Sequence, residues 1–284
     1  MKYLKLLRLD EHYPVIGCIL AASLYLHKSG SWIITWSIAA ISISIVAFML
    51  NEIVDREDTD KYSWNPIHIG THTKLDMRIV TALLISFSTI GLVFSYVSGF
   101  LWWGIAFWII GILYSLKPIR LKARFGLDIL AQVACAFAIP FLAPVSQFGN
   151  IEQGIVLTFV LCCILWSMVL PYQLADIEAD QKAQLKNTHT VMGMKKSIIF
   201  GFSLVVAGVI LYIIFRIFIV ASWSAVMLLF SAFVSIKYIQ WFYLNNLKKQ
   251  IRSMQQYTRI VKPLSQLMVP YLLVWMYLSK LLTF

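Results

Sequence analysis

Long apolar runs alternate with polar connections along the chain. A helix needs about 20 predominantly apolar residues to cross a bilayer. Windows of that length predict nine helices, at 12–27, 31–51, 78–98, 100–116, 127–147, 152–175, 196–215, 218–243 and 263–283. In hydrocarbon a chain must satisfy its own backbone hydrogen bonds, and a helix does so within one segment. The pattern therefore predicts an all-α membrane protein, a bundle of nine transmembrane helices formed by residues 1–284 as one domain.

The connections between these helices differ in charge. Those after the second, fourth, sixth and eighth helices are long and charged, at 51–74, 116–124, 176–196 and 246–262, whereas the others are short. Lys and Arg concentrate in loops on the cytoplasmic side of a membrane. We therefore expect an integral protein of the inner (cytoplasmic) membrane, with the N-terminus and these four connections facing the cytoplasm.

Composition supports this class of protein. The chain is 60% hydrophobic and 13% charged, with a mean hydropathy of +0.78, whereas a soluble domain is about 25% charged. In a soluble chain the net charge of +11 would indicate nucleic acid. Here no basic helix or aromatic platform stands outside the predicted helices, so no nucleic-acid partner is expected. The expected partner of the apolar surface is membrane lipid.

Two acidic clusters end the second and sixth apolar runs. Asn51 and Asp55 are four residues apart, as are Asp176 and Asp180, and this spacing places both members of a pair on one face of a helix. Neighbouring carboxylates repel each other and are costly to bury in a membrane, and a cation between them removes both costs. Mg²⁺ prefers hard oxygen ligands together with a substrate phosphate. The clusters therefore predict a magnesium site on the cytoplasmic side.

The two clusters occupy equivalent places, each at the end of a long apolar run and four helices apart. This placement suggests two related four-helix halves, about 12–125 and 126–245, followed by a ninth helix. The alternative, that two unrelated connections are both acidic, stays open on spacing alone.

Basic residues near the clusters are candidates to bind phosphate groups. They are Arg56 after the first cluster, Lys117, Arg120, Lys122 and Arg124 in the next connection, and Lys182 after the second cluster. Cations and carboxylates at the end of apolar helices suit an isoprenyl diphosphate, whose charged head and apolar tail need both surroundings. For residues 117–124, an anchor for anionic lipids is an equally good explanation.

Other polar residues of these connections have no spacing typical of a site. His68, His72 and His189 lack the HExxH motif or paired spacing of metal ligands and are expected at the surface or in a lid. Asp128 follows Gly126, where capping of a helix N-terminus explains the carboxylate as well as catalysis does.

Four segments occur in an order typical of one membrane-protein family. They are residues 51–60 (NEIVDREDTD), 65–70 (NPIHIG), 114–128 (YSLKPIRLKARFGLD) and 172–180 (YQLADIEAD). They resemble the NDxxDxxxD, NPIxxG, YSxPPxRLKxRxxLD and DxxxD segments of the UbiA superfamily of intramembrane prenyltransferases. The resemblance implies nine helices around a central cavity that opens to the cytoplasmic side and to lipid. It also implies two Mg²⁺ ions that join the substrate diphosphate to both acidic motifs.

The resemblance carries roles over by position. It implies that Asn51, Asp55, Asp176 and Asp180 are metal ligands, that Arg120, Lys122 and Arg124 lie near the diphosphate, and that Tyr114, Tyr172 and Gln173 line the polar end of the cavity. We accordingly expect the catalytic residues to be Asp55, Asp176, Asp180, Arg120 and Lys122, and the substrate-binding residues to be Asn51, Arg56, Tyr114, Lys117, Arg124, Tyr172, Gln173 and Lys182.

The first motif departs from the family pattern at two positions. Glu52 stands where the family has Asp, and Thr59 stands where its last Asp is expected. Asp58 is three residues from Asp55 and lies near the same face of a continuing helix. Asp58 is therefore the expected replacement ligand, with Asp60 as the alternative.

These features favour Mg²⁺-dependent transfer of an isoprenyl group from its diphosphate to a lipophilic acceptor. Breaking the allylic C–O bond leaves a carbocation and a diphosphate, which Mg²⁺ and basic side chains stabilise. The alternative is a UbiA-type terpene cyclase, in which an internal double bond attacks and no external acceptor is used. A lipid-diphosphate carrier is a further rival, but it requires acids along a path through both leaflets. Apart from Glu152, no Asp or Glu is predicted near the outer face.

Overall fold

The structure is a computed structural model that describes residues 2–56 and 74–214. Every named element in these residues is a helix, as the sequence predicts. The first seven predicted transmembrane segments each coincide with a helix or with a continuous run of helices. The last two, 218–243 and 263–283, lie outside the described residues, so the count of nine remains a prediction.

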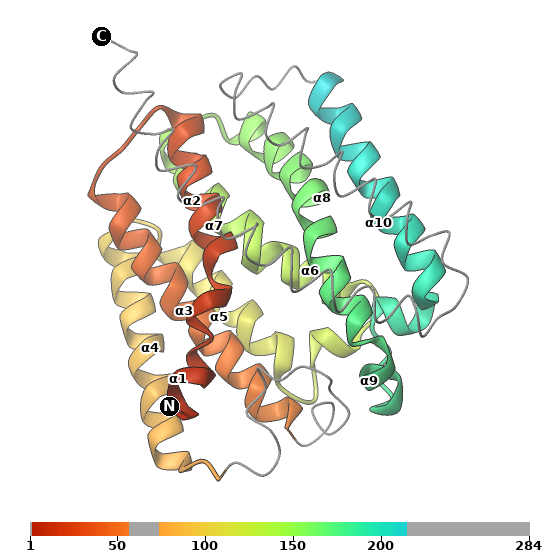
Figure 1. The fold of residues 1–284 in the computed structure, drawn as a ribbon. Coiled ribbons are helices and arrows are strands. Elements are labelled where there is room, and N and C mark those ends of the chain that lie inside the picture. The colour runs from red at the N-terminus through yellow and green to blue at the C-terminus, as the bar shows by residue number, and fades with distance from the viewer. Residues whose placement is uncertain (1, 57–73, 215–284) are drawn as a thin grey trace.

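The first half of the described chain forms four apolar helices, three of them around α3 (Figure 1). They are α2 (Tyr13–Leu26), α3 (Ser31–Asp55), α4 (Met77–Val97) and α5 (Leu101–Ser115). α3 packs against the other three. A Cβ atom added at Gly91 of α4 would lie 2.7 Å from Ile43 Cγ1 of α3, so the absence of a side chain there lets the helices approach. Small residues at helix contacts serve this purpose in membranes.

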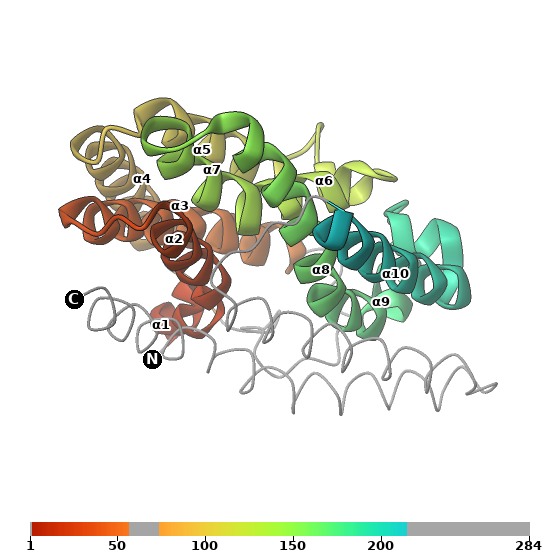
Figure 2. The same cartoon turned by 90° about the horizontal axis from the view of Figure 1, so that it is seen from above.

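A second group of helices follows the connection after α5. It comprises η3 (Leu121–Ala123), α6 (Leu127–Val133), η4 (Ala134–Ala138), α7 (Ile139–Phe148), α8 (Ile151–Ala175), α9 (Ile177–Lys182) and α10 (Thr188–Ile214). α6, η4 and α7 are continuous and fill one predicted segment; η4 is a π-helical turn, a feature frequent at functional sites. In Figures 1 and 2, α8, α9 and α10 lie on one side of the bundle, and α3, α4 and α5 lie on the other.

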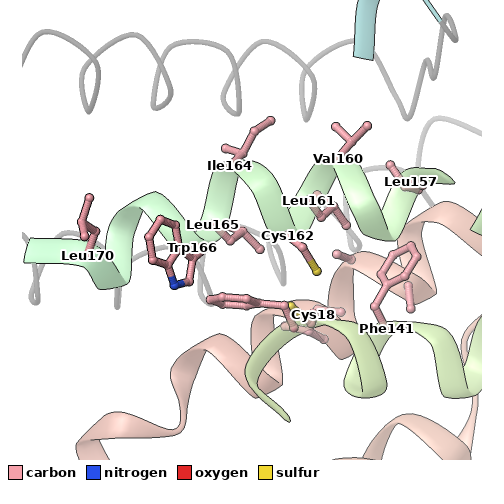
Figure 3. Packing of buried hydrophobic residues seen from close by; sticks show 14 of the residues in the cluster. Cys18, Phe141, Leu157, Val160, Leu161, Cys162, Ile164, Leu165, Trp166 and Leu170 are labelled. Carbon is pink, nitrogen blue, oxygen red and sulfur yellow. The ribbon is translucent and has the colours of Figure 1, made fainter. Parts of the chain in front are cut away.

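A buried apolar cluster joins α8 to its neighbours α2, α7 and α10. In Figure 3, Cys162 points from α8 toward Cys18 and Phe141, whereas Val160 points to the other side of the helix. α8 thus contributes apolar side chains in two directions, which is typical of a helix enclosed by other helices.

Several helices have the length and composition of membrane spans. Four can cross a membrane on these criteria: Ser31–Asp55, Met77–Val97, Leu127–Phe148 and Thr188–Tyr212. Shorter apolar helical segments are Tyr13–Leu26, Leu101–Ser115 and Ile151–Trp166. α4 is strongly apolar, yet only 17% of its most apolar stretch is buried. The exposed side chains of this helix therefore suit contact with lipid.

Helix ends differ from the predicted ones where polar residues continue a helix. α3 runs on to Asp55 instead of ending near residue 51. α10 begins at Thr188, well before residue 196, with a non-helical Gly193 near its start. A hydropathy window ends at the first polar residues, but backbone hydrogen bonds do not require apolar side chains. The short helices α1 (Lys2–Leu7), η1 (Leu9–Glu11) and α9 were not predicted, because they do not fill such a window.

Candidate active site

The first acidic cluster lies in the last turns of α3 and meets two buried cations. Lys122 Nζ donates to Asn51 Oδ1 at 3.2 Å and also forms an ion pair with Asp55 Oδ1. Arg120 Nη2 donates to the same Asp55 oxygen at 3.3 Å. Asp55 is 5% exposed, and Lys122 and Arg120 are each 8% exposed. Charges are buried in proteins when they are paired, and this group satisfies that condition.

The connection between α5 and α6 directs its basic side chains differently. Arg124 Nε donates to the carbonyl of Ile119 at 2.6 Å, and its Nη2 donates to the carbonyl of Pro118 at 3.2 Å. Arg124 is exposed, and its side chain binds carbonyl groups of the loop to which it belongs. The same curled loop carries Arg120 and Lys122 inward to Asp55. The structure thus brings together two of the predicted basic residues but not Arg124.

The second acidic cluster lies at a break between two helices. α8 ends at Ala175, and Asp176 is the N-cap residue of α9. The backbone N–H of Asp180 still donates to the carbonyl of Asp176 at 3.0 Å, so one turn links the two acids. The expected continuous helix through both residues is not formed.

Asp180 belongs to the same electrostatic neighbourhood as the first cluster. Its Oδ2 accepts a hydrogen bond from Asn187 Nδ2 at 2.7 Å. Burial raises the pKa of Asp180 to about 6, Lys122 and Arg120 oppose this rise, and the negative charge of Asp55 adds to it. The charges of the first cluster therefore act on Asp180 of the second cluster.

The loop before α10 is held by side-chain hydrogen bonds. Thr188 donates its backbone N–H to Asp128 Oδ2 at 3.0 Å, and its hydroxyl contacts Asp128 Oδ1. Asn187 Oδ1 accepts from the backbone N–H of Thr190 at 2.8 Å. Asp128 therefore binds the start of α10, and Asn187 joins this loop to Asp180.

A chain of polar side chains runs from Tyr114 into the bundle. Gln132 Nε2 donates to the Tyr114 hydroxyl at 3.3 Å, and Gln173 Nε2 donates to Gln132 Oε1 at 2.6 Å. Gln173 Oε1 in turn meets His189 Nε2. His189 is 2% exposed, so its expected place at the surface or in a lid is wrong. The kink at Gly193 sets the first turn of α10, which carries His189, apart from the rest of that helix.

Glu52 faces a different part of the molecule. It is 1% exposed, and Oε2 lies 3.6 Å from Arg8 Nη2 of the N-terminal segment. The guanidinium of Arg8 also lies 5.5 Å from the ring centre of Phe48. Of the two residues at which the first motif departs from the family pattern, Glu52 therefore pairs with the N-terminal segment.

Three further predicted basic residues differ in their exposure. Lys117 and Lys182 are exposed, and Arg56 is partly buried at the end of α3. Asp58 lies outside the described residues, and so does the side chain of Tyr172. Sequence reasoning had assigned no role to Gln132 or Asn187, each a single polar residue without a motif spacing.

The oxygen atoms at the end of α3 suit a cation. The Lys122 ammonium group contacts Asn51 Oδ1 and Asp55 Oδ1 together, so both oxygens converge on one positive charge. Such carboxylate and amide oxygens are hard ligands that Mg²⁺ accepts. Within residues 2–56 and 74–214, no three His, Cys, Asp or Glu side chains group closely enough to hold a metal alone. A divalent ion here would need further oxygen ligands, which a diphosphate can supply.

A comparison with protein families places most of the chain in one of them. The model of the UbiA prenyltransferase family matches residues 13–260. No curated protein matches the chain.

Solved structures share the fold over nearly the whole chain. A UbiA homolog from Archaeoglobus fulgidus bound to DMAPP and Mg²⁺ has 20% identity and a TM-score of 0.68, covering 96% of this chain and 99% of that one. A structure of digeranylgeranylglyceryl phosphate synthase has 18% identity and a TM-score of 0.64, with 94% and 96% covered. The apo structure of a UbiA homolog from Aeropyrum pernix K1 has 13% identity and a TM-score of 0.62, with 94% and 98% covered.

Proposed function

Since the chain belongs to the UbiA prenyltransferase family, we propose that it transfers an isoprenyl group from an isoprenyl diphosphate to a lipophilic acceptor. The observation that carries this proposal is the buried ion pairing of Asp55 with Lys122 and Arg120, whose charges also act on Asp180. This action, to which the charge of Asp55 contributes, supports one site built from two distant segments. Structures of a UbiA homolog from Archaeoglobus fulgidus contain DMAPP or GPP together with Mg²⁺, which supports the same ligand class for this chain.

The residues that would hold Mg²⁺ are Asn51, Asp55, Asp176 and Asp180, with Asp58 as a further expected ligand. When bound, the metal supplies positive charge that stabilises the leaving diphosphate. Asn51 and Asp55 already present two oxygens to one cation, the Lys122 ammonium group.

Lys122 and Arg120 are proposed to bind the diphosphate oxygens. Both are buried, and a charge-assisted hydrogen bond is strong in such surroundings. Negative charge grows on the diphosphate as the allylic C–O bond breaks, so fixed cations at this place lower the barrier. Tyr114, Gln173 and Tyr172 are proposed to line the polar end of the same site, whereas the exposed Lys117, Arg124 and Lys182 suit contact with lipid headgroups.

The apolar helices have a second task in this reaction. A carbocation reacts with water, so the transferred group must be shielded until the acceptor attacks. The described helices present a continuous buried apolar cluster, and the protein is an integral membrane protein by its apolar helices and family. We place it in the inner membrane with the site and N-terminus toward the cytoplasm.

The test is a transfer assay with the full chain in lipid nanodiscs. Radiolabelled geranyl, farnesyl and geranylgeranyl diphosphates are supplied with Mg²⁺ and with quinone, chlorin, carotenoid and glycerophospholipid acceptors. We expect a labelled lipophilic product that disappears with EDTA and in Asp55→Asn. Turnover unchanged in Asp55→Asn and Asp180→Asn would remove the proposed site.

The terpene cyclase is the second candidate, because the first motif is altered. Glu52, the altered residue that the structure describes, pairs with Arg8 instead of Asp55's partners, so the alteration gives no direct reason to prefer cyclisation. Incubation without acceptor separates the two: release of a cyclic hydrocarbon would favour the cyclase.

A further inference from the structure

The N-terminal segment, residues 2–12, is packed against the helix that carries the first acidic cluster. α1 contacts α3 directly. Leu6 of α1 is fully buried in an apolar cluster that also contains Ile45 and Met49 of α3. Burial of this kind stabilises the contact between the two helices. The segment is therefore a built part of the bundle beside the acidic end of α3.

Two side chains of this segment bind three successive turns of α3. His12 Nδ1 lies 2.9 Å from Ser44 Oγ, and the His12 ring packs edge-on against Phe48 with 5.4 Å between the ring centres. The guanidinium of Arg8 lies 5.5 Å from the same Phe48 ring, and its Nη2 lies 3.6 Å from Glu52 Oε2. Ser44, Phe48 and Glu52 are four residues apart, so they form one stripe along the helix. The N-terminal segment thus follows α3 up to its acidic end.

The segment has a fixed shape of its own. His12 Nε2 lies 2.9 Å from the carbonyl oxygen of Leu7, which can only accept a hydrogen bond, so Nε2 donates. Between these residues, Arg8 has φ 43° and ψ 45°, a left-handed conformation that residues other than glycine adopt rarely. Such a conformation persists where the surrounding structure holds it. The contacts of Arg8 and His12 with α3 account for that hold.

We propose that Arg8 and Glu52 are positioning residues for the diphosphate site, an assignment that rests on the proposed prenyl transfer. Glu52 follows Asn51 directly and precedes Asp55 by one turn of α3, so a displacement of Glu52 moves both candidate metal ligands. Glu52 is 1% exposed, and the Arg8 side chain is 10% exposed. Separation of a buried ion pair leaves charge uncompensated and is costly. The pair therefore resists such a displacement.

A rival explanation makes Glu52 a metal ligand, since Asp stands at this place in the motif that the segment resembles. The structure places Glu52 beside Arg8, whereas Asp55 pairs with the two cations of the connection between α5 and α6. Substitution of Glu52 by Asp separates the two explanations. Asp is shorter by one methylene group, so its carboxylate would draw back from Arg8. Metal binding, in contrast, would tolerate the residue that the motif itself contains.

Mg²⁺-dependent binding of a labelled substrate analogue to the full chain in nanodiscs tests the proposal. The analogue is geranyl S-thiolodiphosphate, which resists cleavage, so binding is measured without turnover. Glu52→Asp, Glu52→Gln and Arg8→Met should each raise the half-saturating Mg²⁺ concentration by about tenfold, as is typical when an outer partner of a metal site is lost. Arg8→Lys keeps the positive charge and should raise this concentration by less than about threefold.

Two controls make the outcome specific to the ion pair. Arg8→Met combined with Glu52→Gln should raise the Mg²⁺ requirement no more than either single variant, because both act through one interaction. Tyr3→Phe removes a hydrogen bond from the same segment, between the Tyr3 hydroxyl and the backbone N–H of Asp76, and should leave the Mg²⁺ requirement unchanged. Effects that multiply in the double variant, or an equal rise in Tyr3→Phe, would overturn the proposal.

The same measurements distinguish failure of this proposal from failure of the proposed function. Wild-type protein that does not bind the analogue with Mg²⁺ would refute the diphosphate site itself. Wild-type binding that depends on Mg²⁺, together with an unchanged Mg²⁺ requirement in Glu52→Asp, would refute the positioning role alone, even where Arg8→Met does not fold.

Discussion

Asp55 is a buried carboxylate whose charge is balanced by Lys122 and Arg120. A buried ion pair adds little net stability, because desolvation offsets the attraction, but removal of one partner leaves an uncompensated charge. A substitution of Asp55 is therefore expected to change both the stability of the protein and its activity. The ion pair also gives a way to measure the two separately, through variants that keep the shape of the side chain.

Asp55→Asn should destabilise the protein by about 3–5 kcal/mol, because Lys122 and Arg120 stay buried beside a neutral amide. Addition of Lys122→Met removes one unpaired charge, so the double variant should recover part of this loss. Transfer activity should stay absent in both. Unfolding in detergent and product formation measure the two effects. Costs that simply add in the double variant would contradict the ion-pair interpretation.

Lys122 and Lys186 offer a matched comparison of a buried and an exposed lysine in neighbouring loops. Lys122→Met should lower turnover by more than tenfold, because the diphosphate loses a charge-assisted hydrogen bond in a buried site. Lys186→Met should change turnover by less than twofold. Rates with saturating labelled geranyl diphosphate check this; equal losses would show that bulk positive charge, not the place of Lys122, matters.

At the scale of elements, α10 depends on an unusual backbone conformation near its start. Gly193 has φ 75° and ψ 166°, a region that residues with a Cβ rarely adopt. The turn before it carries Thr188 and His189, and the helix as a whole is long and apolar enough to cross a membrane. Gly193 thus separates the first turn of α10, which contacts the candidate site, from the long apolar part of the helix.

Gly193→Ala should destabilise the protein by about 1–3 kcal/mol through backbone strain. Gly17→Ala in α2 is the control, because a Cβ at either position meets nothing within 4 Å. Gly17 lies inside a regular helix, where Ala is favoured over Gly by roughly 0.5–1 kcal/mol. Melting temperatures should therefore move in opposite directions. A neutral Gly193→Ala would show that the kink can straighten without cost.

At the scale of the whole molecule, the positive-inside pattern gives an orientation that can be measured. Lys186 and Lys28 are both exposed and are predicted on opposite sides of the membrane. Of the native cysteines, Cys18, Cys162 and Cys163 are buried and Cys135 is partly buried, all of them within apolar helices. In intact cells, a membrane-impermeant maleimide should label Lys28→Cys and should reach Lys186→Cys after the membrane is opened. The reverse result would invert the topology.

Sequence reasoning located the long helices because a bilayer imposes a length on each apolar run. It did not locate α9, which is too short, or the start of α10, where polar residues from Thr188 onward already form a helix. The two proposed four-helix halves stay a prediction, since residues 215–284 lie outside the described part of the chain.

Within the site, spacing located Asn51 and Asp55, because a helix maps four residues onto one face. A run of charges has no such rule, so Arg124 was grouped with Arg120 and Lys122 although its guanidinium binds loop carbonyls. His189 was misplaced because contacts with Gln173 and Trp166, distant in sequence, bury it.

Lys122 is a counterion attached to the chain: it pairs with Asp55 and donates a hydrogen bond to Asn51. A divalent ion would have to compete with the Lys122 ammonium group for these two oxygens. Because Lys122 belongs to the chain, its local concentration at the site is always high. The displaced ammonium group would then need a new negative partner, and the incoming diphosphate provides one. Metal alone should therefore gain little, whereas metal and diphosphate arriving together should load cooperatively. With cooperative binding of this kind, the site would release its metal together with the diphosphate after each turnover.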